Sequence, residues 1–274
     1  MTRLATTADG TALAGDDDGF VPLDSSSEFD TVADALPAAA DGSLSLDSAL
    51  APPTPDDHLQ FTVPFSPVGK LWGIGLNYAE HATDLDENRP DEPASFMKPS
   101  TAVTGPGGPI RLPPLSQSSR VTAEAELGVV IGRTCRNVTA ENAEEVIAGY
   151  VPVIDMTAED ILQRNPRFLT RSKSFDTFIV LGPWIRTTDS VGELTDIEVR
   201  TVVNETVEAR NTIDNMLFRP RELVAFHSNV MTLRPGDVIS TGTPGAHPIE
   251  DGDTVRTEVD EVGHLTADVM RASE

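Results

Sequence analysis

Residues 123–131 have the sequence AEAELGVVI, beginning at Ala123 and ending at Ile131. Successive side chains of a β-strand point to opposite faces, so a strand here places Glu124 and Glu126 on the same face. Two neighbouring carboxylates repel each other unless a cation lies between them, and such oxygen-rich pairs suit Mg²⁺, Mn²⁺ or Ca²⁺ better than zinc. The pattern therefore predicts a strand that carries a metal site. The alternative is a solvated strand face in an acidic protein.

A second segment strengthens the metal prediction. In the segment GYVPVIDM, residues 149–156, Asp155 ends the apolar strand expected at 149–154, where a carboxylate would otherwise lie awkwardly at the edge of a core. As a third oxygen ligand, Asp155 would leave about three octahedral positions of Mg²⁺ or Mn²⁺ for water and substrate. The predicted metal ligands are therefore Glu124, Glu126 and Asp155.

The rest of the chain contains many β-type segments and few helical ones. Helices are expected at about 29–38, 140–148 and 221–228, and there is no regular alternation of strands and helices. This pattern favours a β-rich α+β fold over a doubly wound parallel sheet. Residues 1–66 are rich in Ala, Asp, Ser, Pro and Gly. We therefore predict a small N-terminal domain there and a second domain over residues 67–274.

Composition limits the classes of protein that fit. The chain has 274 residues, of which 39% are hydrophobic, and a single cysteine, Cys135, so an intrachain disulfide is excluded. No apolar run approaches the roughly 20 residues of a membrane helix, and the first residues lack the pattern of a signal peptide. We expect a soluble cytoplasmic protein that buries a sizeable core. Cys135 is expected to be a structural thiol.

The charge is strongly negative. With 44 acidic and 20 basic residues, the formal net charge is −24. An acidic surface of this kind favours a protein from a high-salt cytoplasm, where salt screens self-repulsion, over an ordinary acidic cytosolic protein. It also makes nucleic acid an unsuitable partner, because phosphate binding requires basic patches.

Lysine is rare, and each lysine is therefore a candidate for a position that needs an ammonium group. The chain has three, Lys70, Lys98 and Lys173, and the last two are flanked by apolar and small residues. Either could bind a substrate carboxylate or stabilise a developing oxyanion. The loop TGTPG at 241–245, which contains Thr243, could contact an anionic ligand or could be an ordinary turn.

A candidate general base follows the glycine-containing strand LWGIGLNY. His81 and Asp84 are three residues apart, which places them on one face of a helix. A histidine paired with a carboxylate can take a proton from water or from a carbon acid. The alternative is an ordinary surface histidine.

Seven segments, in this order, resemble the fumarylacetoacetate hydrolase superfamily. The resemblance covers about residues 71–269. The segments are GIGLNYAEH, FMKPSTAVTGPGGPI, AEAELGVVIG, GYVPVIDMTAED, RSKSFDTFIVLGPWI, LRPGDVISTGTPG and EVDEVGHLTADV.

The resemblance implies a catalytic domain with a mixed β-sandwich or roll, preceded by a small N-terminal domain, in a homodimer. It implies Mg²⁺ or Mn²⁺ at the three carboxylates, and His81 on a mobile lid in a water-activating pair with Asp84. Lys173 would face the 2-oxo acid end of the substrate, with Thr243 close by. Lys98 is kept as a further substrate-binding candidate because of its apolar and small neighbours. Metal chelation of the 2-oxo acid would polarise its carbonyl.

Three positions differ from the family pattern. Asp84 stands where many hydrolytic members have a glutamate, and Glu159 replaces the arginine of a T-A-R-D segment that helps to hold substrate. Leu162 stands where a glutamine is common. These differences bear on the substrate and on the reaction rather than on the metal site.

Three functions follow as hypotheses. The first is hydrolysis of a C–C bond in an acylpyruvate-like 2,4-dioxo acid. The second is dehydration, hydration or isomerisation of another 2-oxo acid at the same site, such as a 2-oxo-3-deoxy sugar acid or an unsaturated dicarboxylate of the 2-hydroxyhepta-2,4-dienedioate type. The third is a metal-binding or ligand-binding protein that has lost catalysis, for which Asp84 and Glu159 are the main support.

Overall fold

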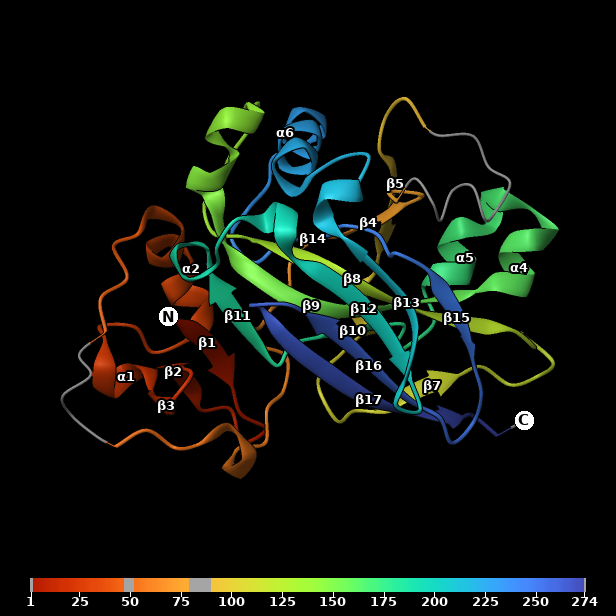
Figure 1. Cartoon of the computed structure of the whole chain (residues 1–274), viewed down its shortest axis with the longest axis horizontal. Helices are drawn as coiled ribbons and strands as arrows, with labels where there is room; N and C mark the ends of the chain where they lie inside the picture. Colours follow the sequence, from red (N-terminus) through yellow and green to blue (C-terminus); the bar gives the residue numbers. More distant parts are fainter. Residues whose placement is uncertain (1, 47–51, 79–89, 274) are drawn as a thin grey trace.

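The computed structural model describes residues 2–46, 52–78 and 90–273 (Figure 1). The helices are α1 (Leu23–Ser26), α2 (Val32–Asp41), α4 (Glu159–Arg164), α5 (Leu169–Lys173) and α6 (Pro220–Val230). Short 3₁₀ turns are η1 (Asp56–His58), η2 (Ser100–Ala102), η3 (Ala140–Val146), η4 (Pro166–Phe168), η5 (Thr188–Ser190), η6 (Leu194–Asp196) and η7 (Ile213–Asn215).

Within these ranges, twelve strands form the larger of two sheets. Its main path has the order β3-β2-β1-β11-β9-β8-β14-β4-β5, while β10 pairs with β9 and β6, and β15 pairs with β8. The strands are β1 (Arg3–Thr6), β2 (Ala12–Asp16), β3 (Gly19–Pro22), β4 (Leu71–Gly75), β5 (Ala94–Lys98), β6 (Val103–Thr104), β8 (Val121–Ile131), β9 (Ile147–Ala158), β10 (Ile179–Leu181), β11 (Trp184–Thr187), β14 (Val238–Ser240) and β15 (Ala246–Ile249).

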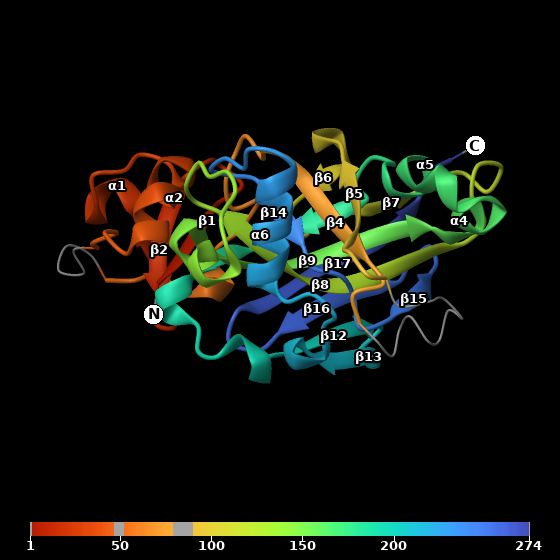
Figure 2. The ribbon, with the colours of Figure 1, turned by 90° about the horizontal axis from the view of Figure 1, so that it is seen from above.

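A second sheet covers β8 and β9. Its order is β13-β12-β16-β17-β7, built from β7 (Ile110–Leu112), β12 (Glu198–Val203), β13 (Thr206–Thr212), β16 (Thr254–Val259) and β17 (Gly263–Arg271). The Ala125 amide donates to the Thr201 hydroxyl on β12, and the Thr257 hydroxyl on β16 donates to the Val153 carbonyl on β9. Figure 2 shows β12, β13 and β16 on one side of β8 and β9. The β-rich α+β fold with a sandwich-like packing is therefore confirmed.

The central pair, β8 and β9, is buried along its whole length. Leu127 and Val129 of β8 join one apolar cluster, whereas Val130 joins another on the opposite face. Two-sided burial explains why most of β9 and the second half of β8, residues 127–131, are nearly continuous apolar runs rather than alternating ones. It also means that the carboxylates carried by this pair lie inside the protein.

The N-terminal residues extend the larger sheet. β1 pairs antiparallel with β11, so the hairpin of β1, β2 and β3 continues the same sheet at its edge (Figure 1). Helix α2 packs on β9, with Leu36 and Ala39 buried in the cluster that contains Val151. The division into domains at 1–66 and 67–274 stays a prediction.

The predicted helices differ from the observed ones mainly at their ends. The helix expected at 221–228 lies within α6, and the helix expected at 29–38 begins and ends about three residues later, as α2. The helix expected at 140–148 is wrong in type, because η3 is a 3₁₀ helix. The Thr139 side chain makes no capping hydrogen bond, and the buried Ile147 already belongs to β9. Among the described residues, no helix is long and apolar enough to cross a membrane.

Candidate metal centre

Three buried carboxylates meet on β8 and β9. Glu124 is directly opposite Asp155 in the antiparallel register, and Glu126 lies two residues further along β8 on the same face. One oxygen from each residue can be chosen so that all three lie within 4.8 Å of one another. Glu124, Glu126 and Asp155 are 9%, 1% and 0% exposed. The solvated strand face considered for this motif is therefore wrong.

Each glutamate has one carboxylate oxygen held by neutral donors. The Thr157 hydroxyl donates to Oε1 of Glu124 in a short hydrogen bond. The Ser240 hydroxyl and the Gly242 amide donate to Oε2 of Glu126, the amide at 2.9 Å. These bonds fix the carboxylates while leaving the other oxygen of each for a cation or a charged side chain.

The loop 241–245 exists because β8 changes partner beside Glu126. β14 ends at Ser240 opposite Gly128, and β15 begins at Ala246 opposite Glu124. The chain between them leaves the ladder, which lets the Gly242 amide reach the carboxylate. Gly242 has φ +95°, and a Cβ there would meet the Asn77 side chain and the Ile74 carbonyl at 2.9 Å, so glycine is needed.

Asp155 is held by two lysines and one backbone amide. Its Oδ1 accepts the Met156 amide at 2.8 Å and forms a short ion pair with Lys98, while its Oδ2 accepts Lys173 at 2.8 Å. Lys173 also donates to Oε2 of Glu124 at 2.9 Å. The three carboxylates thus face two ammonium groups, which leaves one formal negative charge for a cation to neutralise.

Both lysines are enclosed by protein. Lys98 ends β5 and Lys173 ends α5, and they are 5% and 6% exposed. The Lys173 ammonium lies 4.8 Å from the centre of the Phe96 ring, and Lys98 lies 5.9 Å from the centre of the Phe178 ring. Aromatic faces stabilise cations, so these rings help to keep the ammonium groups charged inside the protein.

The electrostatics of the site follow from burial and from this charge pattern. Burial, with the charges of Asp155 and Glu124, raises the pKa of Glu126 to about 8. Burial lowers the pKa of Lys98 to about 8, against the attraction of Asp155. Burial alone would raise the pKa of Asp155, but Lys173 and Lys98 outweigh it and lower that pKa. Lys173 keeps its proton, because Asp155 and Glu124 raise its pKa although burial works against them.

The donor set fits a divalent cation that prefers oxygen. Carboxylate oxygens on rigid strands suit Mg²⁺ and Mn²⁺, and no His or Cys belongs to this cluster within the described part of the chain. Oε1 of Glu126 accepts no hydrogen bond from any described residue.

The remaining predicted site residues have different outcomes. The Thr243 hydroxyl donates to the Gly245 carbonyl within its own loop, at 3.0 Å, and Thr243 is 5% exposed. Its role toward substrate stays a prediction. His81 and Asp84 lie outside the described residues. Cys135 is buried and unpaired, consistent with a structural thiol.

Sequence reasoning missed several groups that hold the carboxylates. Thr157 follows Asp155 by two residues on the same strand face, which is a usable signal. Ser240 and Gly242 have no such signal, because they reach Glu126 from more than 100 positions away. The Asn77 amide donates to the Thr241 carbonyl at 2.7 Å and so supports the same loop.

Glu159 stands where the resemblance implies an arginine, and its carboxylate contacts Arg120 and Gln163 rather than the carboxylate cluster. Its carboxylate forms a short ion pair with Arg120 and accepts a hydrogen bond from Gln163 at 3.0 Å. Glu159 begins α4 directly after β9. The position therefore presents a neutralised carboxylate rather than a cation.

Titration of Glu126 should make the stability of the metal-depleted protein depend on pH. The folded pKa of about 8 is above the ordinary value of 4.5, so the folded state binds this proton more tightly than the unfolded state. The stability that this bound proton contributes to the folded state is therefore fully present below pH 4.5 and is lost as the pH rises toward 8. We expect the free energy of unfolding in EDTA to fall between pH 5 and 7.5, by up to about 1.4 kcal/mol per pH unit for one proton. Urea unfolding at several pH values measures this slope.

The matched control for this titration is Glu126→Gln, which cannot ionise. Its unfolding free energy should lose the downward slope between pH 5 and 7.5 while other groups titrate as before. A wild-type slope equal to that of the variant would contradict the raised pKa.

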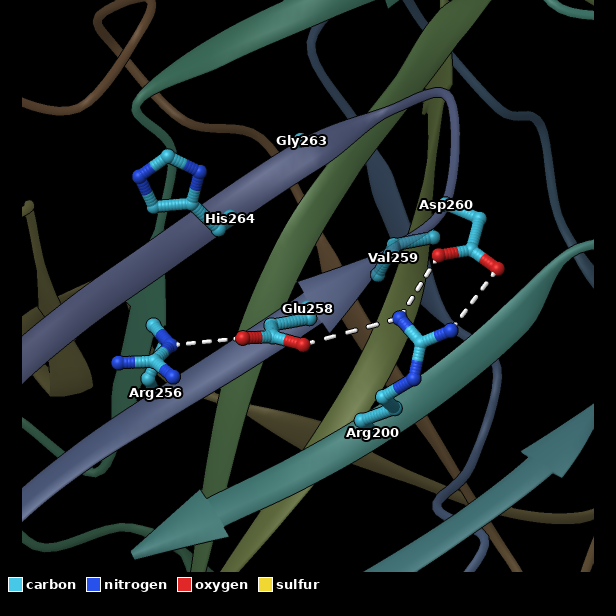
Figure 3. A pocket seen from close by; sticks show the side chains of 7 residues that line it. All are labelled: Arg200, Arg256, Glu258, Val259, Asp260, Gly263 and His264. Atoms are coloured by element: carbon cyan, nitrogen blue, oxygen red, sulfur yellow. Dashed lines mark hydrogen bonds and ion pairs between the residues drawn. The ribbon is translucent and has the colours of Figure 1, made fainter. Parts of the chain in front are cut away.

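A hollow lies on the outer face of the smaller sheet and shares no residue with the carboxylate cluster. Figure 3 shows it between β12, β16 and β17, lined by Arg200, Arg256, Glu258, Val259, Asp260, Gly263 and His264. Arg200 forms ion pairs with Glu258 and Asp260, and Arg256 pairs with Glu258 (Figure 3). The arginines are matched by carboxylates of the same sheet, which is typical of a surface ion-pair network.

Comparison with known proteins decides the family. The model of the fumarylacetoacetate (FAA) hydrolase C-terminal family matches residues 70–270. The chain belongs to the fumarylacetoacetate hydrolase family. Its relatives include an uncharacterized protein of Archaeoglobus fulgidus that is 45% identical over 208 residues, covering 76% of this chain and 80% of that protein.

Two solved structures show the range of chemistry in this family. The 5-carboxymethyl-2-hydroxymuconate delta-isomerase from Mycobacterium smegmatis has a TM-score of 0.79 at 35% identity and covers 100% of both chains. The maleylpyruvate hydrolase from Sphingobium sp. SYK-6, in complex with manganese(II) and pyruvate, has a TM-score of 0.82 at 28% identity, covering 99% of this chain and 100% of that one. This chain is therefore an enzyme of a family that contains both hydrolases and isomerases, and it carries an acidic site suited to a divalent cation.

Proposed function

We propose that this enzyme uses Mg²⁺ or Mn²⁺ to hydrolyse a C–C bond in an acylpyruvate-like 2,4-dioxo acid. The observation that carries the proposal is the contact of Lys173 with two carboxylates of the buried Glu124, Glu126 and Asp155 cluster. This arrangement places an ammonium donor directly beside the site for a divalent cation. The manganese and pyruvate of the maleylpyruvate hydrolase support it, since pyruvate is a 2-oxo acid.

The residues would divide the work as follows. Glu124, Glu126 and Asp155 would hold the cation, which when bound supplies electrophilic polarisation of the 2-oxo carbonyl. Lys173 would donate to the substrate's 2-oxo acid end and stabilise the negative charge that develops during cleavage.

His81 with Asp84 would take a proton from the attacking water, and this part rests on sequence alone. Thr243 would contribute a contact to the same substrate, and two copies of the chain would associate as a homodimer.

Isomerisation or dehydration of a 2-oxo acid at the same site is the second candidate. It is favoured by the similarity to the delta-isomerase and by Glu159, whose carboxylate is paired with Arg120. The family pattern commonly has, at this position, an arginine that helps to hold substrate, so the difference fits another substrate. In this reaction class, proton transfer replaces attack by water, and the carbon chain stays intact.

A substrate screen separates these reactions. The purified protein, supplied with Mg²⁺ or Mn²⁺ at low and at molar KCl, would be given acylpyruvates, oxaloacetate, 2-oxo-3-deoxy sugar acids and unsaturated 2-oxo dicarboxylates. Products would be identified by mass. We expect cleavage of an acylpyruvate into two carbon fragments, loss of that activity in EDTA, and its return with Mn²⁺. Activity that requires molar KCl would support a high-salt origin.

The variant Glu126→Gln tests whether turnover depends on the metal site. We expect it to lose metal binding and turnover together. A shifted double bond, or gain or loss of water without cleavage, would select the second candidate. A protein that binds Mn²⁺ yet leaves every substrate of the panel unchanged would support a binding protein that has lost catalysis.

A further inference from the structure

The two buried lysines contact Asp155 on different oxygens. Lys98 pairs with Oδ1, the oxygen that also accepts the Met156 amide. Lys173 donates to Oδ2 at 2.8 Å and to Oε2 of Glu124 at 2.9 Å. The lysines therefore differ in the carboxylate oxygens that they contact.

Lys98 has all of its hydrogen-bond donors in use. Its ammonium donates to the Met156 carbonyl at 3.1 Å and to the Phe178 carbonyl at 2.5 Å, and its third contact is Asp155. An ammonium has three N–H donors, so none is left for an incoming ligand. With 5% exposure, Lys98 is built into the wall of the site and fixes the orientation of Asp155.

Lys173, unlike Lys98, contacts the carboxylate oxygens that would bind a cation. Its acceptors are the oxygens of Glu124 and Asp155 that no neutral donor among the described residues holds. Together with Oε1 of Glu126, these are the oxygens left to bind a cation. An ammonium and a divalent cation carry charge of the same sign and need the same oxygens, so each weakens the binding of the other.

We propose that the two lysines act on metal binding with opposite signs, Lys98 as a positioning residue that strengthens it and Lys173 as a competing cation that weakens it. This inference rests on the metal site of the proposed function. Its consequence is cooperative binding of the cation and the substrate. A bound divalent cation weakens the hydrogen bonds of Lys173 to Oε2 of Glu124 and Oδ2 of Asp155, which makes its N–H groups available to an anionic substrate. By linkage, the substrate anion and the cation favour each other's binding.

The test measures Mn²⁺ affinity by calorimetry for the wild type and for Lys98→Met, Lys173→Met and Lys70→Met. Methionine has a similar length without the charge. We expect Lys98→Met to weaken Mn²⁺ binding by about 10-fold to 100-fold, the usual effect of removing a group that orients a metal ligand. We expect Lys173→Met to strengthen it by about 5-fold or more. Lys70 bonds Asp237 and none of the three carboxylates, so its variant should bind Mn²⁺ like the wild type.

The outcomes are distinguishable from failure of the proposed function. If Lys98→Met and Lys173→Met change the affinity in the same direction, or if Lys173→Met weakens it, the opposite-sign inference is wrong while the metal site stands. If the wild type binds no Mn²⁺, the proposed function fails and this inference fails with it. Lys98→Arg, which keeps charge and donors, should restore part of the affinity that Lys98→Met loses.

A measurement on the wild type needs variants only to assign its signals. Because the chain has three lysines, ¹⁵N-lysine labelling gives three side-chain ammonium signals by NMR. Addition of diamagnetic Mg²⁺ should shift the Lys173 signal most, the Lys98 signal less and the Lys70 signal least. A Lys98 signal that shifts more than that of Lys173 would overturn the assignment of roles. Lys70→Met and Lys98→Arg assign the signals.

Discussion

Replacing Asp155 by asparagine is expected to abolish measurable Mn²⁺ binding and to lower kcat/KM by at least about 1,000-fold. The variant removes one of three ligands, and it also leaves Lys98 and Lys173 without their shared anionic partner. Two carboxylates would then face two ammonium groups, so the negative charge that attracts a divalent cation would be gone. Loss of several kcal/mol of electrophilic stabilisation corresponds to a rate effect of this size. Calorimetry with Mn²⁺ and steady-state kinetics on the substrate found in the screen measure both effects.

Asp160→Asn is the matched control for this variant. Asp160 lies five residues further along and has the same side chain, but it bonds Ser118 and Arg164 on the flank of α4. It should bind Mn²⁺ and turn over substrate within about threefold of the wild type, as expected for a surface ion pair worth at most about 1 kcal/mol. Full activity of Asp155→Asn would exclude the carboxylate cluster as the metal site.

Replacing Lys173 by methionine should lower kcat by about 100-fold to 1,000-fold while Mn²⁺ still binds. The ammonium of Lys173 donates to two of the oxygens that would hold the cation, and it would stabilise charge that develops only during the reaction. Removal of one such donor typically has an effect of this size on kcat. Steady-state kinetics at saturating Mn²⁺ would separate kcat from KM.

Lys173→Arg is the informative comparison. Arginine keeps the positive charge, but its planar guanidinium cannot make the same two contacts as the ammonium of Lys173, a residue that is only 6% exposed. We expect partial recovery of kcat relative to the methionine variant. An unchanged kcat in Lys173→Met would show that Lys173 does not take part in the reaction and only balances the charge of the carboxylates.

The strands and the metal ligands were predictable because their signals are local. Alternation along β8 places Glu124 and Glu126 on one face, and Asp155 follows an apolar run on β9. The expected strand end at Asp155 is wrong, because β9 continues to Ala158 and stays paired with β8. Burial on both faces explains the apolar composition of both strands, which the sequence displays directly. The helix expected at 140–148 was wrong in type, because its last residues pair with β8 instead of continuing a helix.

The scarcity of lysine also proved informative. Two of the three lysines are buried beside the carboxylates, as expected if lysine persists where an ammonium is needed. Their different roles were not predictable from sequence. Lys98 was predicted to bind substrate, whereas its three donors all contact Asp155 and two backbone carbonyls in the fold.

Local periodicity was enough to predict that Glu124 and Glu126 share a strand face, because alternation of side chains needs no knowledge of what pairs with what. Asp155 was indicated by its place after an apolar run, and the family by the resemblance of seven segments. The partners of those carboxylates depend on strand register and on loop placement across the chain. Ser240 reaches Glu126 over 114 positions, and Lys98 reaches the Phe178 carbonyl over 80. Contacts at such separations exist only after β14, β5 and β10 have docked around β8 and β9, so only the tertiary structure could decide which oxygen each donor holds and which is left for a cation.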